Sequence, residues 1–205
     1  MHKEKALKLA LMIEKYLPKA VVAVSAVDMY NIVKNTKLSV FAQHIDNVKN
    51  KQKSSGFVTL DGIKENRASG SLINHSEHQI GIEDINKLIA DFIKFNLKSV
   101  VCATALKFVE ELLKLKNKPY AIAFEDPELI ATGKSITNYK SEDLKNFVKL
   151  LEGKEILPIC GAGISSLENV VISREIGCKG VLIASAIANV KNPEKLLKDL
   201  QGVKF

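Results

Sequence analysis

The sequence predicts an α/β fold with a mostly parallel sheet, in one domain that spans residues 1–205. Seven short, continuous apolar runs rich in Val, Ile, Leu and Ala are typical of strands that are buried on both faces. Amphipathic helical patterns separate these runs, and strands that alternate with helices form parallel sheets. With 205 residues, 46% of them hydrophobic, the chain is long enough to bury one substantial core.

Each expected element has its own signal in the sequence. The expected strands are Val21–Val24, Leu38–Gln43, Ser69–Leu72, Ser99–Cys102, Tyr120–Phe124, Ile156–Ile159 and Gly180–Ile183. The expected helices between and after them are Val27–Val33, Leu60–Asn66, Ile82–Phe95, Ala105–Leu115, Ser141–Leu151, Leu167–Glu175 and Pro193–Leu200. An acidic first turn at Ser141 and a proline just inside the last helix mark two helix starts.

The polar residues that could do chemistry follow at least four different strands. The ring of loops at one end of a (β/α) barrel produces that distribution, whereas an open doubly wound sheet gathers its functional residues at one switch point. The chain opens with a helical pattern, Met1–Leu17, that no strand precedes. We therefore expect an incomplete barrel of seven parallel strands from which the first strand is absent.

Composition and charge argue against several classes of protein. No apolar run approaches the ~18 residues of a membrane span, and Lys8, Glu14 and Lys15 interrupt the apolar part of Met1–Leu17, which favours an amphipathic helix over a signal peptide. The net charge of +7 comes from lysines spread over every helix, with few arginines and aromatic residues, so we expect no nucleic-acid partner. The same charge would attract an anionic small substrate.

The three cysteines, Cys102, Cys160 and Cys178, are odd in number and lack CxxC spacing. We therefore expect a reducing compartment, the cytoplasm, and neither a disulfide framework nor a zinc site. Cys160 could be read as a nucleophile, but we favour its interpretation as a small core residue.

A carboxylate follows one expected strand directly. Glu125 comes after the run Tyr120–Phe124, and a carboxylate in the apolar mouth of a barrel is suited to general-base catalysis. The alternative is an acidic residue that only caps the next loop.

An imidazole follows another expected strand. His75 ends the run SGSLINH, and the next residues, Ser76–Gln79, resemble a first helical turn. An imidazole beside a helix amino terminus stays neutral and can donate one hydrogen bond to a carbonyl oxygen. The alternative is a structural polar residue. His75 and His78 could also be metal ligands, but no third ligand is evident, so we expect no metal.

Two small-residue turns are suited to binding phosphate. The stretch Gly161–Ser165 follows an expected strand and precedes a helix, and Ala184-Ser185-Ala186 directly follows the last strand. Backbone N–H groups in such turns converge on anions, and the loops after the last two strands of a barrel commonly bind phosphate. The stretch Asp126–Gly133 has proline at one end and small residues at the other, as a hinged lid would. Gly133-Lys134-Ser135 is not a Walker loop, because Glu128 stands where a glycine is required.

The chain resembles archaeal triosephosphate isomerases from about Ala6 to about Leu200. The motifs that carry the resemblance are FAQHID (41–46), LINHSE (72–77), AFEDPELIATG (123–133), CGAGIS (160–165) and LIAS (182–185). The resemblance implies a TIM barrel in which Glu125 is the catalytic base and His75 the neutral electrophile. It implies backbone contacts to the phosphate of a triose phosphate, needing no cofactor and no metal, from Ile130, Gly163, Ala184 and Ser185.

The resemblance also implies a cytoplasmic homo-oligomer, a tetramer built from dimers, to which the polar loop Asp46–Gly56 could contribute. The family opens with a strand that ends in Asn-x-Lys, and this chain has no counterpart of that motif, with which Glu77 would pair. Asp126 replaces a usual proline, and Ala131 and Ala186 replace usual glycines. Either the recorded start is too late or the chain is degenerate, and we favour the first because Glu125 and His75 are intact.

Three functions therefore remain open. The first is an isomerase that interconverts D-glyceraldehyde 3-phosphate and dihydroxyacetone phosphate. The second is a non-catalytic phosphate-binding protein on the same scaffold. The third is an isomerase or lyase that acts on another sugar phosphate.

Overall fold

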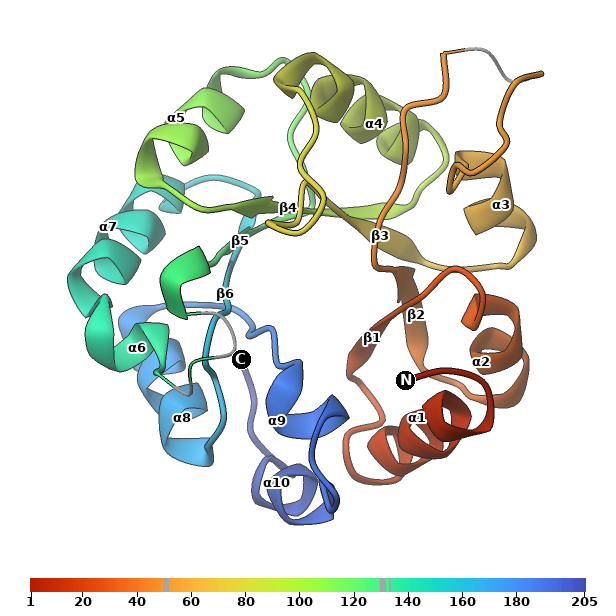
Figure 1. Ribbon diagram of the computed structural model, residues 1–205. Coiled ribbons are helices and arrows are strands. Elements are labelled where there is room, and N and C mark those ends of the chain that lie inside the picture. Colours follow the sequence, from red (N-terminus) through yellow and green to blue (C-terminus); the bar gives the residue numbers. More distant parts are fainter. Residues whose placement is uncertain (50–51, 130–131, 133) are drawn as a thin grey trace. The chain divides into compact units, whose positions relative to one another are not determined.

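Strands and helices alternate along the whole chain (Figure 1). The computed structural model describes residues 1–49, 52–129, 132 and 134–205. The chain forms two compact units, Met1–Val100 and Val101–Phe205. In the described residues no helix is long and apolar enough to cross a membrane.

The structure confirms a parallel α/β sheet and defines six of its strands. They are β1 (Val21–Val24), β2 (Ser39–Ala42), β3 (Gly70–Ile73), β4 (Lys98–Ala103), β5 (Ala121–Phe124) and β6 (Leu157–Cys160). Neighbours in the sheet follow chain order from β1 to β6, and the pairs β1–β2, β2–β3 and β5–β6 are parallel.

The seventh expected strand, Gly180–Ile183, is not confirmed as a strand. It forms a single parallel bridge between Val181 and Cys160. Cys160 N–H donates to Gly180 O over 3.2 Å, and Leu182 N–H donates to Cys160 O over 2.8 Å. This is the pattern of a parallel ladder one residue long.

The expected helices are present, with ends that differ by a few residues. They are α1 (Glu4–Tyr16), α2 (Met29–Asn35), α3 (Leu60–Glu65), α4 (Ile82–Lys94), α5 (Leu106–Lys114), α7 (Ser141–Leu151), α8 (Leu167–Ile176) and α10 (Glu194–Asp199). Three short elements were not expected: a 3-10 turn η1 (Pro127–Leu129) and the helices α6 (Ile136–Tyr139) and α9 (Ser185–Ala188). All three follow expected strands, in the loops where the sequence placed its functional residues.

Helix α4 shows how the first unit buries its core. Its buried residues, Ile85, Leu88, Ile89 and Phe92, recur at the helical spacing of three and four positions. That spacing places them on one face, which packs inward while the acidic first turn faces solvent. Burial of four such side chains favours folding by about 1.5–3 kcal/mol each before the loss of chain entropy.

Helix α7 has the same role in the second unit. Leu144, Phe147 and Leu151 are its buried residues, and the Phe147 ring stacks on Phe124 at a centroid distance of 5.1 Å. Because Phe124 is the last residue of β5, this packing fixes the strand end from which the next residue, Glu125, emerges.

Candidate active site

Glu125 directly follows a strand whose four residues are all buried. Its backbone N–H donates to Ala103 O at the end of β4 over 3.0 Å. The residue is only 7% exposed. Strands β4 and β5 therefore hold this carboxylate in the interior of the second unit, at their carboxyl ends.

A glycine makes the space that the Glu125 carboxylate occupies. A Cβ atom on Gly161 would lie 2.3 Å from Glu125 Oε1 and 2.8 Å from its Cδ. Gly161 itself is held by its N–H, which donates to Phe124 O over 3.0 Å. The first glycine of the predicted phosphate turn thus also supports the predicted base.

The three cysteines, Cys102, Cys160 and Cys178, are buried. Burial, and secondly the Glu125 carboxylate beside it, raise the pKa of the Cys102 thiol well above its usual range. A hydrogen bond with Cys178, and secondly burial, raise the pKa of the Cys160 thiol in the same way. Since the thiolate is the nucleophile, these shifts support the interpretation of Cys160 as a core residue.

The turn Gly161–Ser165 is a tightly held, left-handed segment. Ala162 and Gly163 both have positive φ, 68° and 72°, and a Cβ atom on Gly163 would lie 1.9 Å from Lys134 O. Ala162 O accepts the N–H of Ile136 over 3.1 Å. Backbone turns beside a helix start can present converging N–H groups to an anion.

The amino end of α8 follows this turn and is capped. Ser166 Oγ accepts the N–H of Asn169 over 3.2 Å. Asn169 Oδ1 in turn accepts the N–H of Ser165 over 3.2 Å. These bonds fix the turn relative to the positive end of the α8 dipole, which favours a bound phosphate.

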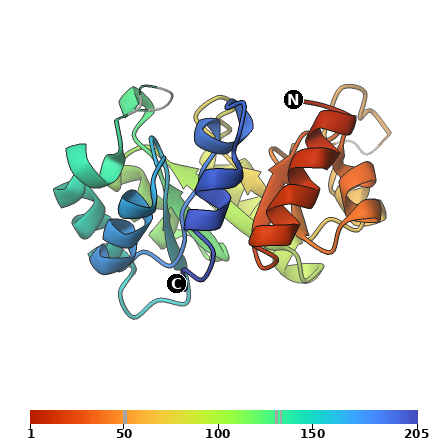
Figure 2. The ribbon, with the colours of Figure 1, turned by 90° about the horizontal axis from the view of Figure 1, so that it is seen from below.

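The predicted lid, Asp126–Gly133, lies between β5 and α6. Its described part begins with an Asp126 turn, in which the side chain accepts the N–H of Glu128 over 2.9 Å and the backbone O accepts the N–H of Leu129 over 3.0 Å. Figure 2 shows η1 (green) at one end of the strands of this unit and the carboxyl terminus at the other. Ile130, predicted to contact phosphate, and Ala131 and Gly133 lie outside the described residues.

The other predicted phosphate contacts begin a short helix in the same unit. Ala184 and Ser185 are exposed, and Ala184 O accepts the N–H of Ala188 over 2.8 Å. Their amide groups lie at the start of α9, just after the residues that pair with β6. The second unit therefore contains Glu125, Gly163, Ala184 and Ser185.

His75 belongs to the first unit and sits in a turn after β3. Asn74 before it has a φ of 62°, and Asn74 Oδ1 accepts the N–H of Ile80 over 2.9 Å. His75 Nδ1 accepts the backbone N–H of Glu77 over 3.3 Å. A neutral imidazole that accepts at Nδ1 carries its proton on Nε2 and donates from that atom.

The prediction of a helical turn directly after His75 is wrong. Residues 76–78 form a turn in which His78 N–H donates to His75 O over 2.8 Å, and α4 starts only at Ile82, after Gly81. The bond from Ile80 to the Asn74 side chain competes with a helical ladder here.

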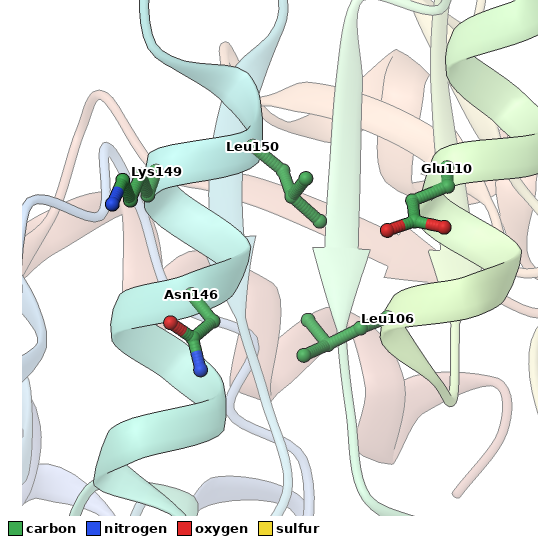
Figure 3. A pocket seen from close by; sticks show the side chains of 5 residues that line it. All are labelled: Leu106, Glu110, Asn146, Lys149 and Leu150. Atoms are coloured by element: carbon green, nitrogen blue, oxygen red, sulfur yellow. The ribbon is translucent and has the colours of Figure 1, made fainter.

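Two further features contain none of the predicted site residues. Sequence reasoning missed a cluster of His44, Asp46 and His78, whose ligand atoms lie within 4.8 Å of one another; the spacing His-x-Asp was the only local signal. A shallow groove on the second unit lies between α5 and α7 (Figure 3). It is lined by Leu106, Glu110, Asn146, Lys149 and Leu150.

The chain is similar in sequence to known proteins over most of its length. The family profile described as triosephosphate isomerase matches residues 2–200. Triosephosphate isomerase of Methanocaldococcus jannaschii is 35% identical over 90% of this chain and 83% of its own length. That of Methanothermus fervidus is 35% identical over 96% and 90%, and that of Sulfurisphaera tokodaii is 34% identical over 96% and 86%.

A solved structure supports the fold alone. The crystal structure of the Amycolatopsis orientalis BexX/CysO complex contains a chain that aligns with a TM-score of 0.63 at 10% identity, over 98% of this chain and 83% of that chain. The profile and the archaeal relatives cover nearly the whole sequence, including every predicted site residue. The chain belongs to the triosephosphate isomerase family.

Proposed function

We propose that the protein interconverts D-glyceraldehyde 3-phosphate and dihydroxyacetone phosphate, with Glu125 as the base and His75 as the electrophile. The family match over residues 2–200 supports the reaction. The observation that carries the assignment of the base is the buried Glu125 carboxylate seated on Gly161, which opens the phosphate-type turn.

In this mechanism Glu125 removes a proton from one carbon of the bound triose phosphate. His75 Nε2–H donates a hydrogen bond to the carbonyl oxygen, on which negative charge develops as the enediolate forms. His75 then gives this proton to that oxygen and takes the proton of the hydroxyl group on the neighbouring carbon, so that the imidazole is neutral again and the negative charge lies on the second oxygen. Protonated Glu125 then returns the proton to the neighbouring carbon, so that the carboxylate is regenerated. A base glutamate with a neutral histidine is the established mechanism of the family.

The phosphate group would be held by backbone N–H groups of Gly163, Ala184 and Ser185, with Ile130 of the lid as a fourth contact. The amino end of α8 adds a favourable dipole. Contacts from backbone N–H groups suit the phosphate ester, because the phosphate group keeps its structure while the two carbon atoms react.

The assembly and location of the protein are part of the same proposal. We expect a homotetramer, as the resemblance to archaeal enzymes implies, which analytical ultracentrifugation would test. The buried thiols Cys102, Cys160 and Cys178 are consistent with a cytoplasmic enzyme.

The test of the mechanism is the substitution Glu125→Gln, which keeps the size of the side chain and removes the base. We expect kcat for glyceraldehyde 3-phosphate to fall by about 10²–10⁴-fold with little change in KM. Glu155→Gln is the matched control, because Glu155 is an exposed glutamate just before β6.

Wild-type turnover by Glu125→Gln would refute the assignment of the base. A wild-type protein that binds a triose-phosphate analogue without turnover would instead be a non-catalytic phosphate-binding protein. Faster turnover of a longer sugar phosphate would favour the third function.

A further inference from the structure

Two imidazoles and a carboxylate converge in the first unit, after β2 and β3. His44 Nε2 is 3.0 Å from Asp46 Oδ1, and the rings of His44 and His78 stack with a centroid distance of 3.6 Å and an interplanar angle of 28°. The ligand atoms that the three residues offer all lie within 4.8 Å of one another. None of the three has a role in the isomerisation proposed above.

The spacing of these atoms is that of ligands around one ion. Two atoms about 2.1 Å from a metal are about 3.0 Å apart at a right angle and about 3.4 Å apart at the tetrahedral angle. The His44–Asp46 distance of 3.0 Å fits this already. His78 is exposed, so it can close the remaining separation by rotating its side chain at little cost in packing.

The Asp46 carboxylate is oriented by the backbone of Val58. Asp46 Oδ2 accepts the N–H of Val58 over 2.8 Å, and Asp46 N–H donates to Val58 O over 2.9 Å. These two bonds hold the side chain so that Oδ1 faces His44. Outer hydrogen bonds of this kind preorganise metal ligands.

The choice of ligands selects the class of ion. Mg²⁺ and Ca²⁺ prefer sites built of oxygen atoms, whereas two imidazole nitrogens and one carboxylate oxygen suit Zn²⁺, Co²⁺ or Ni²⁺. Three protein ligands leave at least one position for water. The side chains of His44 and Asp46 are 17% and 16% exposed, so an ion could enter past His78.

We propose that His44, Asp46 and His78 bind one divalent transition-metal ion, with Zn²⁺ as the representative. The ion takes the place of the proton between His44 Nε2 and Asp46 Oδ1. It joins the loop after β2 to the turn after β3, in which His78 N–H donates to His75 O over 2.8 Å. The site would therefore stiffen the turn that carries His75.

The direct test is calorimetric titration of Zn²⁺ into the purified 205-residue chain, from which metals have first been removed with a chelator. We expect one equivalent to bind, and His78→Ala to weaken binding by about tenfold or more, since loss of even an outer-shell partner costs that much. His78 is exposed, so the variant should fold, and circular dichroism checks this. His2→Ala is the matched control, because His2 is also an exposed histidine beside a carboxylate, 2.8 Å from Asp28.

Co²⁺ as a second probe distinguishes this site from the thiols. We expect visible absorption from nitrogen and oxygen ligands, without the near-ultraviolet band of a cobalt–thiolate bond, and its loss in Asp46→Asn. The proposal is overturned if wild-type protein binds no equivalent of Zn²⁺, if His78→Ala binds it as well as wild type does, or if a thiolate band appears. These readouts do not depend on isomerase activity, so they stand apart from the proposed function.

Discussion

At the scale of single residues, the position of the Glu125 carboxylate depends on the absence of a side chain at Gly161. Gly161 has no Cβ, and one placed there would lie 2.3 Å from Glu125 Oε1 and 2.8 Å from its Cγ. Backbone bonds hold both residues, Glu125 to Ala103 and Gly161 to Phe124. Neither backbone can retreat easily, so an added methyl group must displace the carboxylate.

Gly161→Ala is therefore predicted to reduce catalysis more than binding. A shift of about 1 Å in a catalytic group costs about 10²-fold in rate, so kcat should fall by about that factor while KM changes little. Gly180→Ala is the control, because its Cβ would make only ordinary contacts, the nearest at 3.5 Å to Ile159. Steady-state kinetics of both variants make the comparison, and equal activities would show that the carboxylate position is not critical.

At the scale of elements, the turn Gly161–Ser165 connects three structures: the base, the start of α6 and the amino end of α8. Gly163 is its tightest point. It combines a φ of 72° with a Cβ position 1.9 Å from Lys134 O. Gly153 has nearly the same backbone, with a φ of 70°, but nothing lies within 4 Å of its Cβ position.

Alanine substitutions at Gly153 and Gly163 distinguish the cost of a left-handed backbone from the cost of a steric clash. Gly153→Ala should cost only the left-handed backbone penalty of about 1–2 kcal/mol in unfolding free energy. Gly163→Ala should cost more and should also weaken the binding of inorganic phosphate, because the turn must move away from Lys134. Thermal unfolding and inhibition by inorganic phosphate, measured for both variants, test this. If Gly163→Ala bound phosphate as well as wild type does, the turn would not be part of the phosphate-binding site.

The same elements show what the sequence could and could not predict. Continuous Val- and Ile-rich runs placed six strands to within two residues at each end, because burial on both faces leaves a local signal. The run Gly180–Ile183 has that signal too, yet only Val181 bridges to a neighbouring strand. The sequence predicts a helical turn after His75, but the bond from Ile80 N–H to the Asn74 side chain favours a different turn there, and a sequence pattern does not reveal such a bond. The contact of Glu125 with Gly161 and that of His78 with His44 join residues far apart in the sequence, so no local pattern predicts them.

At the scale of the whole molecule, stability in acid depends in part on one buried carboxylate. Asp28 is 4% exposed and precedes α2. Its oxygens accept the N–H of Lys3 over 2.7 Å and face His2 Nδ1 at 2.8 Å. Burial opposes ionisation, but the Lys3 N–H, then the hydrogen bond and charge of His2, outweigh it and lower the pKa of Asp28 below its usual 3.8.

A pKa that folding lowers makes stability rise with pH. The folded chain holds the Asp28 carboxylate ionised where the unfolded chain would bind a proton. The contribution of Asp28 to the free energy of unfolding is therefore complete above about pH 5 and is lost as the pH falls through the folded pKa.

The substitution Asp28→Asn removes this contribution to the free energy of unfolding. We expect its Tm to lie about 2–4 °C below wild type at pH 7, the shift that about 1 kcal/mol causes in a chain of this size. The gap should narrow as the pH falls below 4. Asp199→Asn, at an exposed position on α10, should follow the wild-type curve. Melting curves of Asp28→Asn and wild type that stay parallel down to about pH 3 would show that Asp28 contributes nothing to acid stability.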